Sequence, residues 1–275
     1  MVAAFPNSFY IKTSRHELIF VTNRQLRSPI TINLEPETNL RHTAKPLETV
    51  SLNEHEIRVG QSTSIDLTRA TKSNESPVPK EHRLTMTREF LYLGSLILMI
   101  IDNRLSVLDP KGLAHAGVSE FISKGIIPFR QSDDSRRFCD VAGKIVGLGG
   151  GFTPSGDDLL GGFFATYNSF ARAIGRQMVL LDFDFVESKT SWISAKLFDY
   201  IQRRILDDQV RELIDSTAKG NTDAAIAVLE TLLPRGHTSG IDILVGVILA
   251  LCLVFDIQSK ASEMGKLVES LGLSS

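Results

Sequence analysis

The first quarter of the chain carries short runs of β-branched and aromatic residues between turn-forming residues. Residues 30–34, Ile-Thr-Ile-Asn-Leu, alternate strictly between apolar and polar side chains, which is typical of a strand with one buried face. The four runs cover residues 9–12, 18–22, 30–34 and 64–67. Several short strands joined by polar turns predict a small β-barrel or sandwich-like domain over residues 1–75.

The spacing of apolar residues changes after a polar stretch that contains Pro77 and Pro79. Residues 76–85 predict a linker, because they lack a regular apolar period and contain a helix-breaking proline. From residue 87 onward, apolar residues recur at intervals of three and four, which is the helical period. Residues 86–275 therefore predict a mainly helical domain, and the whole chain an α+β fold.

The helical period also gives the expected positions of individual elements. Helices are expected at residues 87–101, 118–125, 132–146, 157–174, 191–205, 209–218, 224–233 and 241–255, with a polar helix after the last. Residues 179–185 predict a short strand or an extended connection. The apolar run 241–255 is shorter than the roughly 20 residues that cross a bilayer, so we expect a buried helix there.

The segment 147–162 concentrates conformationally special residues, Gly-Leu-Gly-Gly-Gly-Phe-Thr-Pro-Ser-Gly-Asp-Asp-Leu-Leu-Gly-Gly. Ser155 is a candidate N-cap of the helix that follows, with Asp158 as its capping-box partner. A glycine loop at a helix start offers free N–H groups and the positive end of a dipole, which together suit an anion. The same pattern is also how an ordinary helix begins.

Two nucleotide-binding loops are excluded by the residues themselves. A phosphate loop needs a lysine after its glycines, and none follows here. A dinucleotide fingerprint needs a small residue at position 152, where Phe152 stands.

A second copy of this motif precedes the last apolar run, His-Thr-Ser-Gly-Ile-Asp-Ile-Leu-Val-Gly over residues 237–246. The matched pairs are Ser155 with Ser239, Gly156 with Gly240, Asp158 with Asp242, and Gly162 with Gly246. Gly162 and Gly246 each lie seven residues after their serine, which predicts a close crossing of two parallel helices. Each helix start would then lie roughly 10 Å from the crossing, and we expect both serines to cap their helices within about 15 Å of each other.

Composition narrows the function classes. A net charge of −2 over 275 residues leaves no basic footprint, so we expect no nucleic-acid partner. The apolar content of 43 % is enough for a real core. Cys139 and Cys252 do not require a disulfide, and residues 1–6 lack the pattern of a signal peptide. These features predict a soluble cytoplasmic protein without a membrane partner.

The two motifs resemble those of a family long catalogued as of unknown function, some members of which are named as the H subunit of oxamate carbamoyltransferase. Residues 147–162 match its signature closely, with Phe152 where leucine is usual, and His237-Thr-Ser-Gly-x-Asp is similar to its second motif. The resemblance implies a role in anaerobic allantoin or purine breakdown. There a multi-subunit enzyme moves a carbamoyl group from carbamoyl phosphate to oxamate, giving oxalurate and phosphate.

The motifs supply the candidate site residues. His237 is a candidate proton donor or acceptor, and Asp158 is the second catalytic candidate. The residues expected to bind a small anionic substrate are Gly149, Gly150, Gly151, Thr153, Ser155, Gly156, Asp157, Ser239, Gly240 and Asp242. We expect no cofactor and no metal site, except for a Mg²⁺ ion that Asp157 would bridge to phosphate. Alternatively, Asp157 binds an amino group or simply faces water, and His237 bonds only a loop carbonyl.

Two other functions fit the same sequence. In one, the chain is a non-catalytic scaffold or binding subunit whose loops only start buried helices. In the other, it is a stand-alone Mg²⁺-dependent enzyme that acts on a phosphorylated small molecule through Asp157, Asp158 and Asp242.

Overall fold

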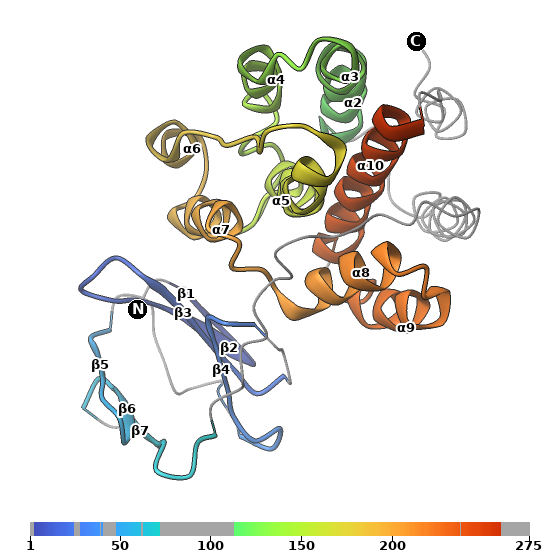
Figure 1. Cartoon of the computed structure of the whole chain (residues 1–275). Coiled ribbons are helices and arrows are strands. Elements are labelled where there is room, and N and C mark those ends of the chain that lie inside the picture. Colours follow the sequence, from blue (N-terminus) through green and yellow to red (C-terminus); the bar gives the residue numbers. More distant parts are fainter. Residues whose placement is uncertain are drawn as a thin grey trace. The chain divides into compact units, whose positions relative to one another are not determined.

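The computed structural model describes residues 3–24, 28–38, 40, 48–61, 63–71, 113–236 and 238–259. The chain divides into two compact units, Met1–Pro77 and Val78–Ser275 (Figure 1). The described part of the first unit consists of strands and that of the second of helices, which confirms the α+β class. The predicted linker at residues 76–85, the predicted helix at 87–101 and the predicted polar C-terminal helix lie outside the described residues.

The first unit contains a four-stranded sheet in the order β1-β2-β3-β4. Its strands are β1 (Ala3–Phe5), β2 (Ser8–Lys12), β3 (Leu18–Thr22) and β4 (Thr31–Asn33). Neighbours β1–β2 and β2–β3 are antiparallel, whereas β4 runs parallel to β3. Apolar side chains alternate along β2, so Phe9 and Ile11 point into the core and are 1 % and 4 % exposed.

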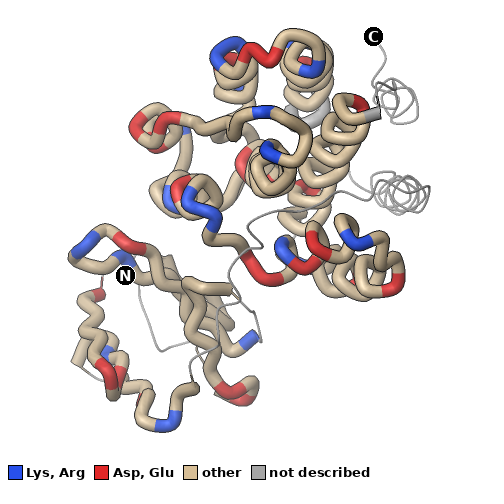
Figure 2. Tube along the Cα trace, in the orientation of Figure 1, with Lys and Arg blue, Asp and Glu red and all other residues tan. Residues whose placement is uncertain are grey.

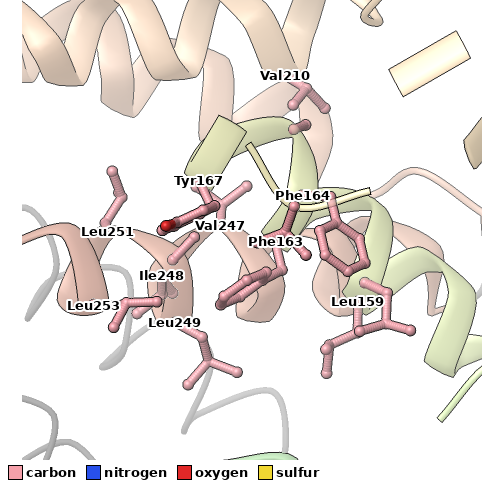
Figure 3. Close-up of a cluster of buried hydrophobic side chains, with 14 of the residues drawn as sticks. Leu159, Phe163, Phe164, Tyr167, Val210, Val247, Ile248, Leu249, Leu251 and Leu253 are labelled. Atoms are coloured by element: carbon pink, nitrogen blue, oxygen red, sulfur yellow. The ribbon is translucent and has the colours of Figure 1, made fainter. Parts of the chain in front are cut away.

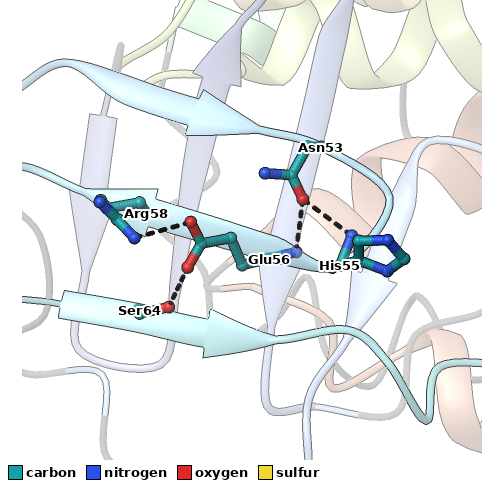
Figure 4. Close-up of polar contacts among 5 residues, drawn as sticks. All are labelled: Asn53, His55, Glu56, Arg58 and Ser64. Carbon is teal, nitrogen blue, oxygen red and sulfur yellow. Dashed lines mark hydrogen bonds and ion pairs between the residues drawn. The ribbon is translucent and has the colours of Figure 1, made fainter.

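A three-stranded antiparallel sheet completes this unit, with β5 (Val50–Leu52), β6 (Glu56–Val59) and β7 (Thr63–Asp66) in sequence order. The Asn53 side chain fixes the β5–β6 turn by accepting the backbone N–H groups of His55 and Glu56. Glu56 in turn accepts from Arg58 and Ser64, so the exposed face of the sheet is polar (Figure 4). Ile57 and Val59 point the other way and join the buried cluster that contains Phe9 and Val21.

The second unit is a set of helices joined by short connections. They are α2 (Leu113–Glu120), the π-helical turn η1 (Phe121–Ile126), α3 (Ile127–Ser132), α4 (Ser135–Ala142), α5 (Ser155–Phe170), the 3₁₀ turn η2 (Ala171–Ile174), α6 (Phe183–Lys189), α7 (Trp192–Gln202), α8 (Asp208–Ala218), α9 (Thr222–Leu232) and α10 (Ser239–Ser259). Several begin with the side-chain caps that their sequences offer, for example Asn221, whose side chain accepts the N–H of Ala224.

Helices α5 and α10 form the centre of the helical unit. Phe163 and Tyr167 of α5 are fully buried and stack at 6.1 Å between ring centroids. Val247, Leu249 and Leu253 of α10 are equally buried and belong to the same cluster, as Figure 3 shows. Because both helices are covered on most sides, their apolar residues do not form a single stripe, and this explains why the run 241–255 looked membrane-like in sequence.

Among the described residues, α10 is the one helix long and apolar enough to cross a membrane, but 72 % of its apolar window is buried inside the protein. This burial agrees with the prediction of a core helix. Figure 2 shows that charged residues are spread over the surrounding helices, whereas Asp242 and Asp256 are the only charged residues in α10.

Two sequence predictions in this unit need correction. The helix expected to end at Gly125 continues through η1 into α3. Gly125 is buried, and a Cβ atom there would lie 3.2 Å from Phe121 and 3.3 Å from Val141, closer than ordinary van der Waals contact. Pro128 lies in the first turn of α3, directly after the π-helical turn η1, and the chain stays helical through it.

The second correction concerns residues 179–185, where a short strand or an extended connection was predicted: residues 179–182 are an extended connection, whereas residues 183–185 are helical. Val179 is extended, and its backbone N–H and carbonyl bond the side chain of Asn168 instead of a neighbouring strand. Phe183 and Phe185 belong to α6, which Asp182 caps by accepting the N–H of Phe185. The aromatic β-like composition concealed this N-cap.

Candidate functional site

The glycine loop joins α4 to α5 and depends on glycine for its own backbone. Gly147, Gly149 and Gly151 have φ angles of +79°, +109° and +93°, a region that residues with a Cβ rarely adopt. A Cβ atom at position 147 would in addition fall on the carbonyl oxygen of Lys189. These glycines are therefore required to form the loop, whether or not a ligand binds.

The tip of the loop projects into open space. A Cβ atom at Gly150 or Gly151 would meet no atom within 4 Å, and the Phe152 side chain is 47 % exposed. The tip is nevertheless fixed at its far end, because Ser191 Oγ donates to the Phe152 carbonyl at 2.6 Å. The backbone of Gly150 and Gly151 is thus open to approach, and their binding of a substrate stays a prediction.

Asp157 anchors the loop from inside. The residue is only 5 % exposed, and its carboxylate oxygen Oδ1 accepts a hydrogen bond from the Gly147 N–H at 2.8 Å. The Thr190 hydroxyl donates to Oδ2. Burial raises the pKa of Asp157, while the bonds from Thr190 and Gly147 counteract that rise. The alternative that Asp157 faces water is therefore wrong.

Helix α5 begins differently from the sequence prediction. Pro154 occupies the N-cap position with φ −55° and ψ 148°, and no side chain caps the helix. Ser155 is the first helical residue, so its predicted role as N-cap is wrong. Proline fits here because its fixed φ suits the boundary and it has no N–H to satisfy. Ser239 is likewise the first residue of α10.

The two motifs contact each other because the serine of each motif pairs with the aspartate of the other. Ser155 hydrogen-bonds Asp242 of the other motif, and Ser239 hydrogen-bonds Asp158. A threonine of its own loop adds a second bond to each aspartate, Thr153 to Asp158 and Thr238 to Asp242. The predicted pairing of Ser155 with Asp158 within one capping box is replaced by this reciprocal arrangement. The predicted meeting of the two helix starts is confirmed, whereas the predicted cleft between them stays a prediction.

Burial changes the acidity of both carboxyl groups at this junction. It raises the pKa of Asp158 to about 7, with repulsion from Asp242 adding to the effect, while Ser239, Thr153 and Arg235 lower it. Burial also raises the pKa of Asp242, against the hydrogen bonds from Ser155 and Thr238. Among the described residues, no hydrogen-bond partner reaches Oδ2 of Asp158 or Oδ2 of Asp242, although both atoms are buried.

The next helical turns of α5 and α10 are also in direct contact. A Cβ atom at Gly162 would fall on the carbonyl oxygen of Ile243, and one at Gly246 on that of Leu159. The two glycines thus make equivalent contacts from opposite helices, and they permit a closer approach than side chains would allow. This confirms the predicted crossing and carries both helix starts to the same side.

Gly156 and Gly240 allow the two helix starts to pack closely against other backbone segments of the chain. A Cβ atom at Gly156 would fall on the carbonyl oxygen of Ile145, and one at Gly240 on that of Leu232. A valine side chain at position 156 would therefore meet the backbone of Ile145 rather than a space for a ligand, so Gly156→Val would disturb the fold itself.

The basic residues near the motifs are already paired. Arg235 Nη1 lies 2.9 Å from Asp207 Oδ2, although its charge still lowers the pKa of Asp158. Lys144 Nζ lies 3.1 Å from Glu120 Oε1 on the surface. The junction is therefore acidic, and an anion there would depend on backbone N–H groups and helix ends.

Two predictions about the site remain, the role of His237 and a Mg²⁺ ion at Asp157. His237, the other catalytic candidate, lies outside the described residues. Within the described residues, no group of three or more His, Cys, Asp or Glu side chains could hold a metal ion. Because both Asp157 oxygens already accept bonds inside the fold, the structure gives no support to a Mg²⁺ ion at this residue.

Sequence reasoning missed Thr190, Ser191 and Thr238. Thr190 and Ser191 precede α7, and Ser191 caps that helix by accepting the N–H of Ser194. Their cap signature was visible in the sequence, but nothing indicated that they would contact a loop some forty residues earlier. Thr238 stands inside the second motif and was overlooked because Thr153 has no counterpart at the same position.

A known protein family matches the part of the chain that contains both motifs. Residues 145–251 match a family model described as oxamate carbamoyltransferase subunit AllH, in agreement with the resemblance drawn from the motifs. The match begins just before the glycine loop and ends inside α10, so it covers both motifs. No curated protein and no solved structure matches the chain.

Proposed function

We propose that this chain, whose residues 145–251 match that family, is a subunit of a carbamoyltransferase-type enzyme of purine and allantoin breakdown. In this proposal, the chain acts with other subunits and binds a small anionic substrate at the paired loops. The word subunit in the family's description supports a multi-subunit assembly.

The observation that carries the proposal is the reciprocal pairing of Ser155 with Asp242 and of Ser239 with Asp158. It brings two helix N-termini and two acidic groups to one junction beside an exposed glycine tip. Helix N-termini favour negative charge, and free backbone N–H groups can stabilise charge that develops during acyl transfer.

The proposed reaction needs a proton carrier. The C–O bond between the carbamoyl group and phosphate breaks, and a C–N bond to the oxamate amide nitrogen forms. That nitrogen loses a proton, and the departing phosphate gains one. Asp158 is suited to carry it, because a pKa of about 7 lets the group accept and release a proton near neutral pH. His237 is the second candidate for this role.

The charges at the junction favour anion binding at the glycine tip and proton transfer at Asp158. Two carboxyl groups lie at the helix starts, and Arg235 is paired with Asp207. A phosphate or carboxylate group would therefore bind at the open backbone of Gly150 and Gly151 rather than between the aspartates. In this arrangement, the glycine tip holds the anion and Asp158 handles the proton.

The test uses the tagged full chain isolated together with the chains that bind it, assayed with carbamoyl phosphate and oxamate. Formation of oxalurate and phosphate is expected, with a loss of about 10²-fold or more in Asp158→Asn if the group transfers the proton. Asp140→Asn is the matched control, because Asp140 is exposed and lies outside the junction. The same assay on His237→Asn tests the other candidate, and an assay with a chelator tests the Mg²⁺-dependent alternative.

The scaffold alternative is favoured by one observation, which is that the chain's own carboxyl groups already occupy both helix starts. Unchanged transfer rates in both Asp158→Asn and His237→Asn assemblies would establish that alternative and refute the proposed site. Absence of oxalurate from the wild-type assembly would refute the proposed reaction.

A further inference from the structure

The segment that joins α6 to α7 holds the glycine loop at both of its ends. The Thr190 hydroxyl donates to Asp157, whose other carboxylate oxygen accepts the Gly147 N–H at the start of the loop. Ser191 Oγ donates to the Phe152 carbonyl at 2.6 Å, just beyond the glycine tip. The shape of the loop therefore depends on two hydroxyl groups from a segment much later in the chain.

Ser191 makes two hydrogen bonds at this contact. Its hydroxyl oxygen accepts the Ser194 N–H at 3.1 Å and so caps α7, while the hydroxyl proton is donated to the Phe152 carbonyl. Ser194 Oγ reaches the same carbonyl at 3.4 Å, which is a longer and weaker bond. Ser191 is therefore the main donor that orients the peptide group between Phe152 and Thr153.

The orientation of this peptide group decides where the Thr153 N–H points. The peptide is trans, so its carbonyl and its N–H point in opposite directions. With the carbonyl held by Ser191, the Thr153 N–H points away from the start of α7. Among the described residues, no group accepts the N–H of Gly150, Gly151 or Thr153. The loop thus presents three backbone donors, and Ser191 fixes the direction of the last one.

We propose that Ser191 is a positioning residue for the anion site at the glycine tip. By holding the Phe152 carbonyl, it keeps the Thr153 N–H available to a phosphate or carboxylate group of the substrate. This role rests on the proposed function, because it concerns binding of the same anions. Ser191 takes no part in the proton transfer assigned to Asp158, so loss of its hydroxyl should weaken substrate binding more than it slows turnover.

The test measures KM and kcat for carbamoyl phosphate and oxamate in the assembly isolated with the tagged full chain. Ser191→Gly removes the donor but leaves α7 nearly as stable, because glycine is also accepted at an N-cap. KM for one of the two substrates should rise about tenfold, as expected for one lost hydrogen bond to a charged group, while kcat changes by less than about twofold. Ser191→Thr keeps the hydroxyl and should restore a KM close to that of wild type.

Asn221→Gly is the matched control, because the Asn221 side chain caps α9 by accepting the Ala224 N–H. It should leave both constants unchanged. An unchanged KM in Ser191→Gly, or equal effects of Ser191→Gly and Asn221→Gly, would overturn the role of Ser191 and leave the proposed reaction intact.

A second variant covers the case in which Ser191→Gly does not fold. Ser191→Cys replaces the hydroxyl with a thiol, which is a weaker donor on a side chain of similar size. Its KM should rise by a smaller factor, and a KM equal to that of wild type would overturn the proposal. Absence of oxalurate from the wild-type assembly is a different result, because it would refute the proposed function and with it the anion-binding role of Ser191.

Discussion

Gly246 of α10 lies against Leu159 of α5 so closely that a Cβ atom at position 246 would fall on the Leu159 carbonyl oxygen. Gly162 makes the equivalent contact with Ile243 in the opposite direction. The closest approach in the core is therefore between backbones, and the side chains that surround it are fitted to that separation.

Substituting Gly246 with alanine should destabilise the protein, although alanine favours helices by about 1 kcal/mol over glycine. The added methyl group forces the helices apart, and overpacking of this kind costs about 1–3 kcal/mol. The measurement that tests this prediction is the free energy of unfolding, obtained by chemical denaturation. Gly161→Ala is the matched control, because its nearest neighbour would be an Ile201 methyl at an ordinary 3.4 Å. The same or greater stability in Gly246→Ala than in Gly161→Ala would contradict the close crossing.

Gly156→Val should prevent folding of the helical unit rather than remove only binding. Its Cβ atom would fall on the Ile145 carbonyl oxygen, which cannot move without disturbing the turn before the glycine loop. Circular dichroism and soluble yield report the outcome. Gly150→Ala has no neighbour within 4 Å and should fold normally, so it is the variant that tests ligand approach at the tip. A folded Gly156→Val protein would contradict the close contact between Gly156 and the Ile145 backbone.

Asp157→Ala should destabilise the protein by about 2–4 kcal/mol, because it leaves two donors without an acceptor. These are the Gly147 N–H and the Thr190 hydroxyl. Denaturation of Asp157→Ala, Thr190→Val and the double variant forms a cycle that measures the coupling between them. Additive effects in this cycle would exclude a direct bond. Limited proteolysis should also cut the glycine loop faster in Asp157→Ala.

Cys139 should react slowly with alkylating reagents at pH 8. Burial raises the pKa of its thiol, and the adjacent Asp140 carboxylate raises it further, so less of the reactive thiolate is present. Labelling in a Cys252→Ser background isolates Cys139, and Asp140→Asn should increase the rate because it removes the repulsion. A rate above that of an unhindered free thiol would refute this account.

Local patterns were sufficient to predict much of the fold. Runs of β-branched and aromatic residues predicted β2, β3, β4 and β7, and the helical period predicted α5 and α7 to α10 within a few residues. The patterns failed where a local signal had a tertiary cause. Gly125 looked like a helix end but is a packing contact, and the aromatic run at Phe183 looked like a strand but follows the Asp182 cap.

For the candidate site, the sequence predicted which segments meet but not how they pair. Identical Ser-Gly-x-Asp starts and glycines seven residues later indicated the crossing. A capping box within each motif was the natural expectation from either motif alone. The exchange between Ser155 and Asp242 arises only when both helices are in place, and Pro154 then takes the boundary position.

The reciprocal junction has a consequence for synthesis of the protein. Its two halves begin more than eighty residues apart in the chain. At about 5–20 residues per second, α5 would leave the ribosome roughly 4–16 s before its partner has been made. During that interval, Leu159 and Phe163 have no α10 to cover them, and contacts of such long separation form slowly even in the complete chain. Chaperones that recognise apolar helices should therefore bind the nascent chain in the window between the two motifs, and release it once α10 has emerged.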